Sequence, residues 1–152
     1  MKGTRGFTLA EIIVVVAILG IIASIVLVNL ATAARKSRDG DRQGDLRTLQ
    51  SAVELYKQKY GRYPAGCRGA GSWSGQIGTS FACAGGSTQY IGRLAPEFIP
   101  TLPIDKRLNG VNSGYVYTTN AAGTVFKLMA KRTVESETVT YNHPFKSCDA
   151  TD

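Results

Sequence analysis

The sequence predicts an α+β protein in which one long N-terminal helix packs on a small antiparallel sheet. Three observations lead to this prediction: residues 7–30 are almost wholly apolar, residues 46–60 carry apolar side chains at helical spacing, and residues 115–132 alternate as strands do. The 152 residues suffice for one ordinary globular domain. A hydrophobic content of 43% at a net charge of +7 excludes a wholly disordered chain.

The first element is an uncharged apolar helix. Of the 24 residues from Phe7 to Leu30, 19 are apolar, and no residue from Ile12 to Ala34 is charged. As a helix, 24 residues span roughly 36 Å, enough to cross the core of a bilayer. Its 16 Phe, Leu, Ile and Val side chains contribute about −5 to −10 kcal/mol to insertion. Glu11 opposes insertion by at most a few kcal/mol, so we expect this helix to enter a membrane.

Two other interpretations of this segment remain open. A secretory signal peptide would be cleaved at an A-x-A-like site, and Ala-Thr-Ala at residues 31–33 fits such a site loosely. A plain membrane anchor leaves Glu11 unexplained, because an ionisable group in a membrane segment normally has a partner. Glu11 follows Phe7 by four residues and therefore shares its helix face. A cut before Phe7 would create an amine able to neutralise Glu11 in its own chain or in a neighbour.

The start of the chain resembles a known processing signal. Residues 1–6 (Met-Lys-Gly-Thr-Arg-Gly) form a short basic leader, and Phe-Thr-Leu-Ala-Glu follows at residues 7–11, ahead of the apolar run. This combination resembles the prepilin signature of type IV pilins and type II secretion pseudopilins. The resemblance implies cleavage by a prepilin peptidase after Gly6 and N-methylation of Phe7. It also implies that Glu11 pairs with the Phe7 amine of an adjacent subunit during assembly.

A second, amphipathic helix half follows the apolar half. Its apolar residues recur at steps of three and four, at Leu46, Leu49, Val53, Tyr56 and Tyr60. Gly61 and Pro64 end the pattern as C-cap and stop. We expect one nearly continuous helix over residues 7–60, about 81 Å long. Gly40 and Gly44 each cost about 1 kcal/mol in a helix interior, so a bend or frayed turn is expected there.

A long glycine-rich loop follows the helix. Residues 61–92 hold 9 of the 17 glycines, and a loop of this length needs to be tied down. Three cysteines allow three single-disulfide pairings, and an extracytoplasmic location favours a disulfide. We favour a bridge between Cys67 and Cys83, which closes a short loop. The resemblance to pilins, which often tie down their C-terminal region, keeps open a bridge from Cys148 to either partner.

The remaining chain predicts an extended segment and then strands. Three prolines make residues 93–105 extended or turning. Residues 115–119 and 124–132 read as strands joined by a turn, and a third run around residues 138–141 completes a three-stranded antiparallel meander. Alternation places Phe126, Leu128 and Ala130 toward the helix and the intervening lysines on the other face. Residues 102–105 and 114–117 also resemble the segment before the first strand of major pseudopilins.

Catalytic and cofactor chemistry is not indicated. The only histidine, His143, precedes Pro144 near the tail and suggests a surface residue rather than a general base. The glycines between residues 66 and 92 do not stand between a strand and a helix, as a phosphate-binding loop would. We therefore expect no enzyme activity and no cofactor.

A metal site is not expected either. The resemblance to major pseudopilins, which bind calcium in a C-terminal loop, raises the question of that ion. Asp105, Asn109 and Asn112 could offer oxygen ligands, but only one of the three is a carboxylate. Calcium sites need six or more oxygens, several of them carboxylates, so a solvated loop is favoured.

Nucleic-acid binding is a weaker alternative. Residues 35–62 contain eight basic and four acidic side chains, a mixture typical of a solvated helix face. Tyr60, Arg62 and Tyr63 could stack on bases and contact phosphates, but capping of the core is favoured. We therefore do not favour nucleic acid as a partner.

The expected organisation follows from these segments. We expect a cleaved prepilin leader at 1–6, a transmembrane and filament-core helix half at 7–34, and an extracytoplasmic globular domain at 35–152, divided into the amphipathic helix half 35–60, loop 61–92, Pro-rich segment 93–105, β-meander 114–141 and tail 142–152. The positive-inside rule alone would not place residues 35–152 outside, because basic residues follow the apolar segment. The resemblance does place them outside.

The resemblance implies the subunit of a type IV pilus-like filament. The subunit would be stored in the inner membrane, processed by a prepilin peptidase and methylase, and assembled by a pilus platform into a helical homo-oligomer. The product would be an extracellular or cell-surface fimbrium that serves adhesion or motility. A pseudopilin of a type II secretion system and a DNA-uptake (competence) pilin are the alternatives.

Overall fold

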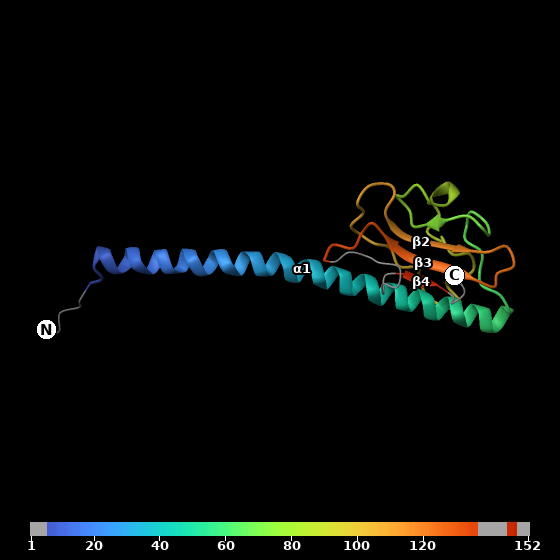
Figure 1. Cartoon of the computed structure of the whole chain (residues 1–152), viewed down its shortest axis with the longest axis horizontal. Coiled ribbons are helices and arrows are strands. Elements are labelled where there is room, and N and C mark those ends of the chain that lie inside the picture. The colour runs from blue at the N-terminus through green and yellow to red at the C-terminus, as the bar shows by residue number, and fades with distance from the viewer. Residues whose placement is uncertain (1–5, 137–145, 149–152) are drawn as a thin grey trace. The chain divides into compact units, whose positions relative to one another are not determined.

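One long helix and a four-stranded antiparallel sheet make up the main regular structure of the described chain (Figure 1). The computed structural model describes residues 6–136 and 146–148. The chain divides into two units, Met1–Ser37 and Arg38–Asp152, and each is described by itself. The α+β class predicted from the sequence is confirmed.

Helix α1 (Leu9–Tyr60) has 52 residues and confirms the single helix predicted for residues 7–60. Of the bend or frayed turn predicted at Gly40 and Gly44, the frayed turn is wrong, because the helix continues through both glycines, and the bend stays a prediction. The side chains of Asp39 and Arg42 are buried and ion-paired, and these interactions offset the helix-weakening effect of the glycines.

The C-terminal end of α1 is capped as predicted. Gly61 adopts a left-handed φ of +74°, and its N–H donates to the carbonyl of Lys57 at 2.8 Å. Glycine adopts this conformation without the steric cost that a Cβ would bring. The cap turns the chain away from the helix toward Tyr63, which is buried.

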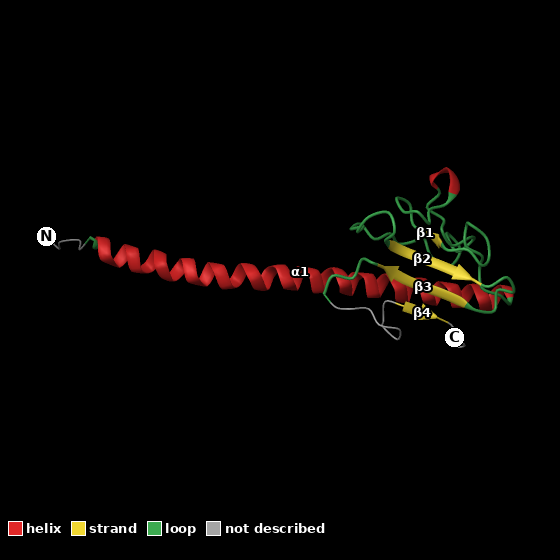
Figure 2. Ribbon diagram, turned by 45° about the horizontal axis from the view of Figure 1, so that its top comes forward, coloured by secondary structure: helices red, strands yellow, loops and turns green. Residues whose placement is uncertain are grey.

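The sheet has the order β1-β2-β3-β4, with every neighbouring pair antiparallel (Figure 2). Its strands are β1 (Ser74–Gly75), β2 (Gly114–Thr119), β3 (Phe126–Lys131) and β4 (Lys146–Cys148). The central β2–β3 pair confirms the predicted hairpin. The third strand predicted at residues 138–141 lies outside the described residues, and β4 falls in the segment that was predicted to be a tail.

The core of the second unit lies between the apolar stripe of α1 and one face of the sheet. The helix contributes Leu46, Leu49, Val53 and Tyr56, all at most 6% exposed, and the sheet contributes Tyr115, Tyr117, Phe126, Leu128 and Ala130. The predicted inward face of β3 is therefore confirmed. Tyr60 is an exception to the predicted stripe, because at 45% exposure it packs at the rim on Tyr56 and Phe98.

The loop 61–92 is tied to the sheet at several points. It contains β1 and a short 3₁₀ turn, η1 (Ala84–Gly86). Backbone bridges join Gly66 to Ile91 and Gly75 to Ala82. Position 75 requires glycine, because a Cβ there would lie only 2.8 Å from the side chain of Phe81.

The predicted disulfide between Cys67 and Cys83 is confirmed, with Cα atoms 5.7 Å apart. Both sulfurs are therefore used, and the alternative bridges from Cys148 to either of these residues are not formed. The bridge links two positions 16 residues apart within the loop that packs beside β2.

Replacing both Cys67 and Cys83 by serine is expected to lower the free energy of unfolding by about 3 kcal/mol, because the open loop gains entropy in the unfolded chain. Urea unfolding of the full chain in non-ionic detergent, followed by the fluorescence of Trp73, measures the loss. The matched control, Cys148→Ser, should leave the unfolding midpoint unchanged. An equal loss in that control would contradict the assignment of the bridge.

Candidate functional site

The N-terminal segment presents an exposed peptide bond before the helix. Gly6, Phe7 and Thr8 lie outside α1, and Phe7 is 85% exposed. A Cβ on Gly6 would meet no atom within 4 Å. Among the residues of this unit that the structure describes, none covers the predicted cleavage position between Gly6 and Phe7.

Thr8 and Glu11 form a reciprocal cap at the start of α1. The backbone N–H and the hydroxyl of Thr8 both donate to Oε2 of Glu11 at 2.8 Å, and the N–H of Glu11 donates to Oγ1 of Thr8 at 3.3 Å. This is a capping box, in which residues three apart satisfy the free N–H groups of a helix start. It explains why α1 begins at Leu9 rather than at the predicted Phe7.

The capping box gives Glu11 a role that the sequence analysis missed. The pattern Thr-x-x-Glu before an apolar run is a readable signal for it. The predicted pairing of Glu11 with the Phe7 amine of another subunit is a contact between chains, and it stays a prediction.

The described side chains in the apolar half of α1 are exposed. Its described large apolar side chains between Phe7 and Leu30 are all at least half exposed. By length and composition, α1 contains a segment able to cross a membrane, and none of that apolar window is buried. The hydroxyl of Ser24 donates to the carbonyl of Ile21 at 2.7 Å, so this polar group is satisfied within the helix.

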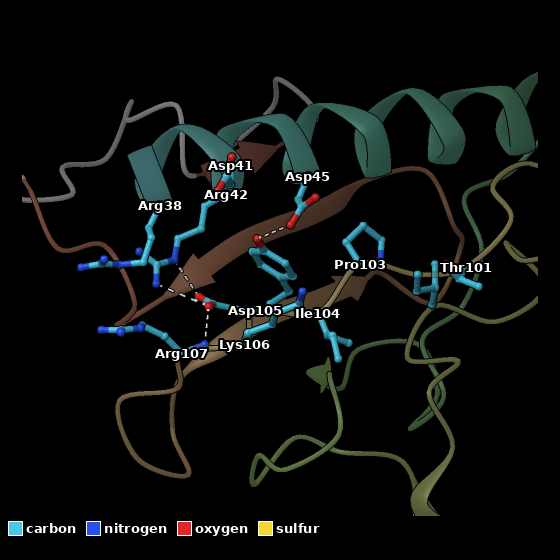
Figure 3. A pocket seen from close by; sticks show the side chains of 12 residues that line it. Arg38, Asp41, Arg42, Asp45, Thr101, Pro103, Ile104, Asp105, Lys106 and Arg107 are labelled. Carbon is cyan, nitrogen blue, oxygen red and sulfur yellow. Dashed lines mark hydrogen bonds and ion pairs between the residues drawn. The ribbon is translucent and has the colours of Figure 1, made fainter. Parts of the chain in front are cut away.

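The second unit contains a buried ionic cluster around one arginine. The Arg42 side chain is 4% exposed and contacts three carboxylates: Asp39 at 2.6 Å, Asp105 at 2.7 Å and Glu135 at 3.1 Å. These groups come from α1, from the segment before β2 and from the segment after β3. Figure 3 shows Arg42 reaching from α1 toward Asp105. The solvated helix face predicted here is wrong for Asp39 and Arg42, because long-range partners bury them.

Further hydrogen bonds complete this cluster. Arg38 donates to both oxygens of Glu135, and Asp39 accepts the backbone N–H groups of Glu135 and Ser136 and the hydroxyl of Ser136. The bond from Arg38, helped by Arg42, lowers the pKa of Glu135 to about 2. Burial acts to raise the pKa of Asp39, but the bonds from Ser136 and Arg42 outweigh it and lower that pKa.

A cavity of about 570 Å³ opens beside the cluster, between residues 38–45 of α1 and residues 101–107 (Figure 3). Within it, the Tyr115 hydroxyl donates to Asp45 at 2.7 Å. Burial raises the pKa of Asp45 and also that of Tyr115. Arg42 and Asp45 are both bound to side chains of the same unit. These contacts are therefore suited to holding α1 against the neighbouring segments of that unit.

Two of the residues considered for calcium, Asp105 and Asn112, bind other side chains of the protein. The carboxylate of Asp105 binds Arg42, and the side-chain oxygen of Asn112 accepts the Ser80 hydroxyl at 2.6 Å. Asn109 is exposed. In residues 6–136 and 146–148, no group of three or more His, Cys, Asp or Glu side chains is arranged to hold a metal ion.

The residues considered for nucleic-acid binding differ in their exposure to solvent. Tyr63 is 3% exposed and packs edge-on against Phe126 at 4.7 Å between ring centroids, so its predicted role in capping the core is confirmed. Tyr60 packs on Tyr56 at 4.5 Å and donates its hydroxyl to Glu97. Arg62 is exposed.

Comparison with known proteins supports the resemblance of the N-terminal segment. Residues 1–27 match the family model described as the prokaryotic N-terminal methylation motif. This match confirms the prepilin-type signature predicted from residues 1–11. No solved structure gave a significant match to the chain.

Curated relatives carry one name. The chain is 44% identical over 61 residues to the type II secretion system core protein G of Pectobacterium carotovorum subsp. carotovorum, covering 40% of this chain and 39% of that protein. It is 46% identical over 67 residues to the protein of the same name from Klebsiella pneumoniae, covering 42% and 46%. The protein from Dickeya chrysanthemi is 41% identical over 68 residues, covering 45% and 44%. The chain thus spans less than half the length of these relatives, whose name assigns them to a type II secretion system.

Proposed function

We propose that this chain is a structural subunit of a helical pilus-like filament and that it polymerises through the apolar half of α1. The observation that carries the proposal is this apolar helix, whose described large side chains are at least half exposed on every side. A helix that is apolar all round needs lipid or other helices around it. The methylation motif at residues 1–27 supports a subunit whose helix moves from lipid into contact with other helices.

The segments of the chain then have separate tasks. Residues 1–6 are the leader removed by a prepilin peptidase, which also methylates Phe7. Residues 7–34 hold the subunit in the inner membrane and later form the filament core. Residues 35–152 form the globular part outside the membrane. The disulfide between Cys67 and Cys83 is consistent with this location, because disulfides persist in oxidising compartments.

The relatives favour one machine among the alternatives. Their name points to a type II secretion system, so we favour a pseudopilus over a surface pilus or a competence filament. The filament would then stand in the periplasm rather than extend as an extracellular fimbrium. Fractionation of cells distinguishes these cases, because a surface pilus shears into the medium and a short periplasmic filament does not.

Replacing Gly6 by valine is expected to leave a full-length precursor in the membrane. A side chain at this position obstructs the extended approach of the backbone to a peptidase, whereas glycine does not. Mass spectrometry of the intact wild-type chain should find an N-methylated Phe7 as the first residue, and the variant should begin at Met1.

The matched control is Gly3→Val, which makes the same change within the leader and should be processed normally. A Gly6→Val chain that begins at Phe7 would remove the proposed cleavage site. A wild-type chain that begins after residue 30 would instead support the signal-peptide interpretation and overturn the proposed filament core.

A further inference from the structure

A second cavity lies in the globular unit where three loops meet. It measures about 490 Å³ and is lined by residues from 62–66, 92–93 and 119–123, with Tyr56 and Ala70 at its margin. Backbone hydrogen bonds fix the loops to one another: Tyr63 donates to Gly123 at 2.8 Å, and Gly92 donates to Ala65 at 2.9 Å. The cavity is therefore framed by loops that are hydrogen-bonded to one another.

Glycine permits each close approach in this frame. A Cβ on Gly66 would lie 2.3 Å from the Ser74 hydroxyl oxygen, and one on Gly92 would lie 3.0 Å from the Ala65 carbonyl oxygen. A Cβ on Gly123 would lie 3.0 Å from the Cβ of Arg62. Larger residues at these three positions would push the loops apart.

The charge of the lining is of one sign. Among the described residues that line it, only Arg62 and Arg93 are charged, and none carries a carboxylate. Both arginines are exposed, and neither guanidinium has an ion pair or hydrogen bond to the described residues. The nearby carboxylates are engaged elsewhere: Glu54 accepts the Tyr63 hydroxyl, and Glu97 is paired with Lys59.

The backbone at Arg93 supports a binding role. Arg93 has a φ of +59°, which non-glycine residues rarely adopt, between Gly92 and the fully buried Leu94. Such a conformation persists only where the surrounding structure imposes it, and it is concentrated at binding sites. Here it places an arginine in the cavity lining that also contains Arg62.

The aromatic residues indicate which class of anion fits. Tyr56 and Tyr63 line the cavity but are only 6% and 3% exposed, and their rings pack on Tyr60 and Phe126. The lining that the structure describes therefore offers no exposed ring for stacking of a base, which single-stranded nucleic acid binding normally requires. Guanidinium groups bind carboxylates through two parallel hydrogen bonds without such rings.

We propose that this cavity binds carboxylate side chains of an acidic polypeptide segment through Arg62 and Arg93, with the Asn120 turn as its polar rim. The inference stands on the geometry of the globular unit and does not depend on the proposed filament. Its occupant is a segment of another protein rather than a nucleic acid.

Titration of the full chain in non-ionic detergent with hexaglutamate tests the proposal. Backbone amide NMR signals of Gly92 and Gly123 should shift on addition of the peptide, and hexalysine should cause no shift. The double variant Arg62→Gln/Arg93→Asn should bind at least tenfold more weakly. Asparagine is chosen because it tolerates a left-handed φ.

The chain offers a closely matched control in Arg47→Gln/Arg132→Asn. It makes the same change of charge at exposed arginines outside the cavity, and Arg132 has the same kind of backbone, with a φ of +55°. Its affinity should stay within twofold of wild type. An equal loss in this control, no shifts with hexaglutamate at millimolar concentration, or equal or tighter binding of a thymidine hexanucleotide would each overturn the proposal. The single variant Arg62→Gln decides the matter if the double variant unfolds.

Discussion

Replacing Glu11 by glutamine is expected to reduce filament yield at least tenfold while leaving membrane insertion intact. Glutamine keeps the side-chain oxygen that accepts the N–H and hydroxyl of Thr8, so the capping box is retained. It removes only the negative charge that would neutralise the Phe7 amine of a neighbouring subunit. An amine left without its partner in a dry helix bundle costs several kcal/mol, and each ~1.4 kcal/mol is tenfold in an association constant.

The measurement is the amount of sedimentable filament divided by the amount of processed subunit in the membrane. Glu11→Leu should fail in the same way, because it also lacks the charge. Thr8→Val is the contrasting variant, since it removes the hydroxyl cap and keeps the carboxylate. It should weaken the helix start by about 1 kcal/mol and reduce the yield much less.

This pair of variants separates two roles of one side chain. Within the single chain, Glu11 is engaged with Thr8, so its contacts are explained by helix capping alone. If Glu11→Gln assembles normally and Thr8→Val does not, the capping box is the function of Glu11 and the charge pair between subunits is excluded.

The helix and the hairpin could be predicted because each depends on a local pattern, and the disulfide could be favoured because Cys67 and Cys83 close a short loop. The stripe from Leu46 to Tyr56 follows the helical period, and β3 alternates between buried and half-buried residues. The capping box between Thr8 and Glu11 is equally local but was not predicted, because the same carboxylate also belongs to the processing signal that the N-terminus resembles.

The ionic cluster could not be predicted from local patterns. Arg42 binds Asp105, which follows it by 63 residues in the sequence, and Glu135, which follows it by 93 residues. Charged residues are almost never fully buried unless they are paired, and pairing over such separations leaves no periodic signal. The second cavity has the same origin, because its lining combines Arg62 and Arg93 from loops that are far apart in the sequence.

Replacing Arg42 by alanine is expected to lower the free energy of unfolding by about 3–5 kcal/mol, because three carboxylates lose a buried cation. The contacts that Arg42 makes between α1 and the segments around Asp105 and Glu135 should be lost first. Urea unfolding of the full chain in non-ionic detergent, followed by Trp73 fluorescence, measures the loss. Arg47→Ala is the matched control on the exposed side of the same helix and should change stability by about 0.5 kcal/mol or less.

The pH dependence of this loss identifies its electrostatic origin. In the wild type the pKa of Glu135 is about 2, below its ordinary value of 4.5, and the pKa of Asp39 is also lowered. Groups with depressed pKa values stabilise the fold above their unfolded-state pKa and lose that contribution as the pH falls toward the folded-state value. The wild type should therefore lose stability between pH 5 and pH 2, as Glu135 becomes protonated. In Arg42→Ala, protonation relieves the unpaired carboxylates, so the difference in unfolding midpoint should narrow from pH 7 to pH 3. A difference that stays constant over this range would mean that Arg42 acts by packing rather than by charge.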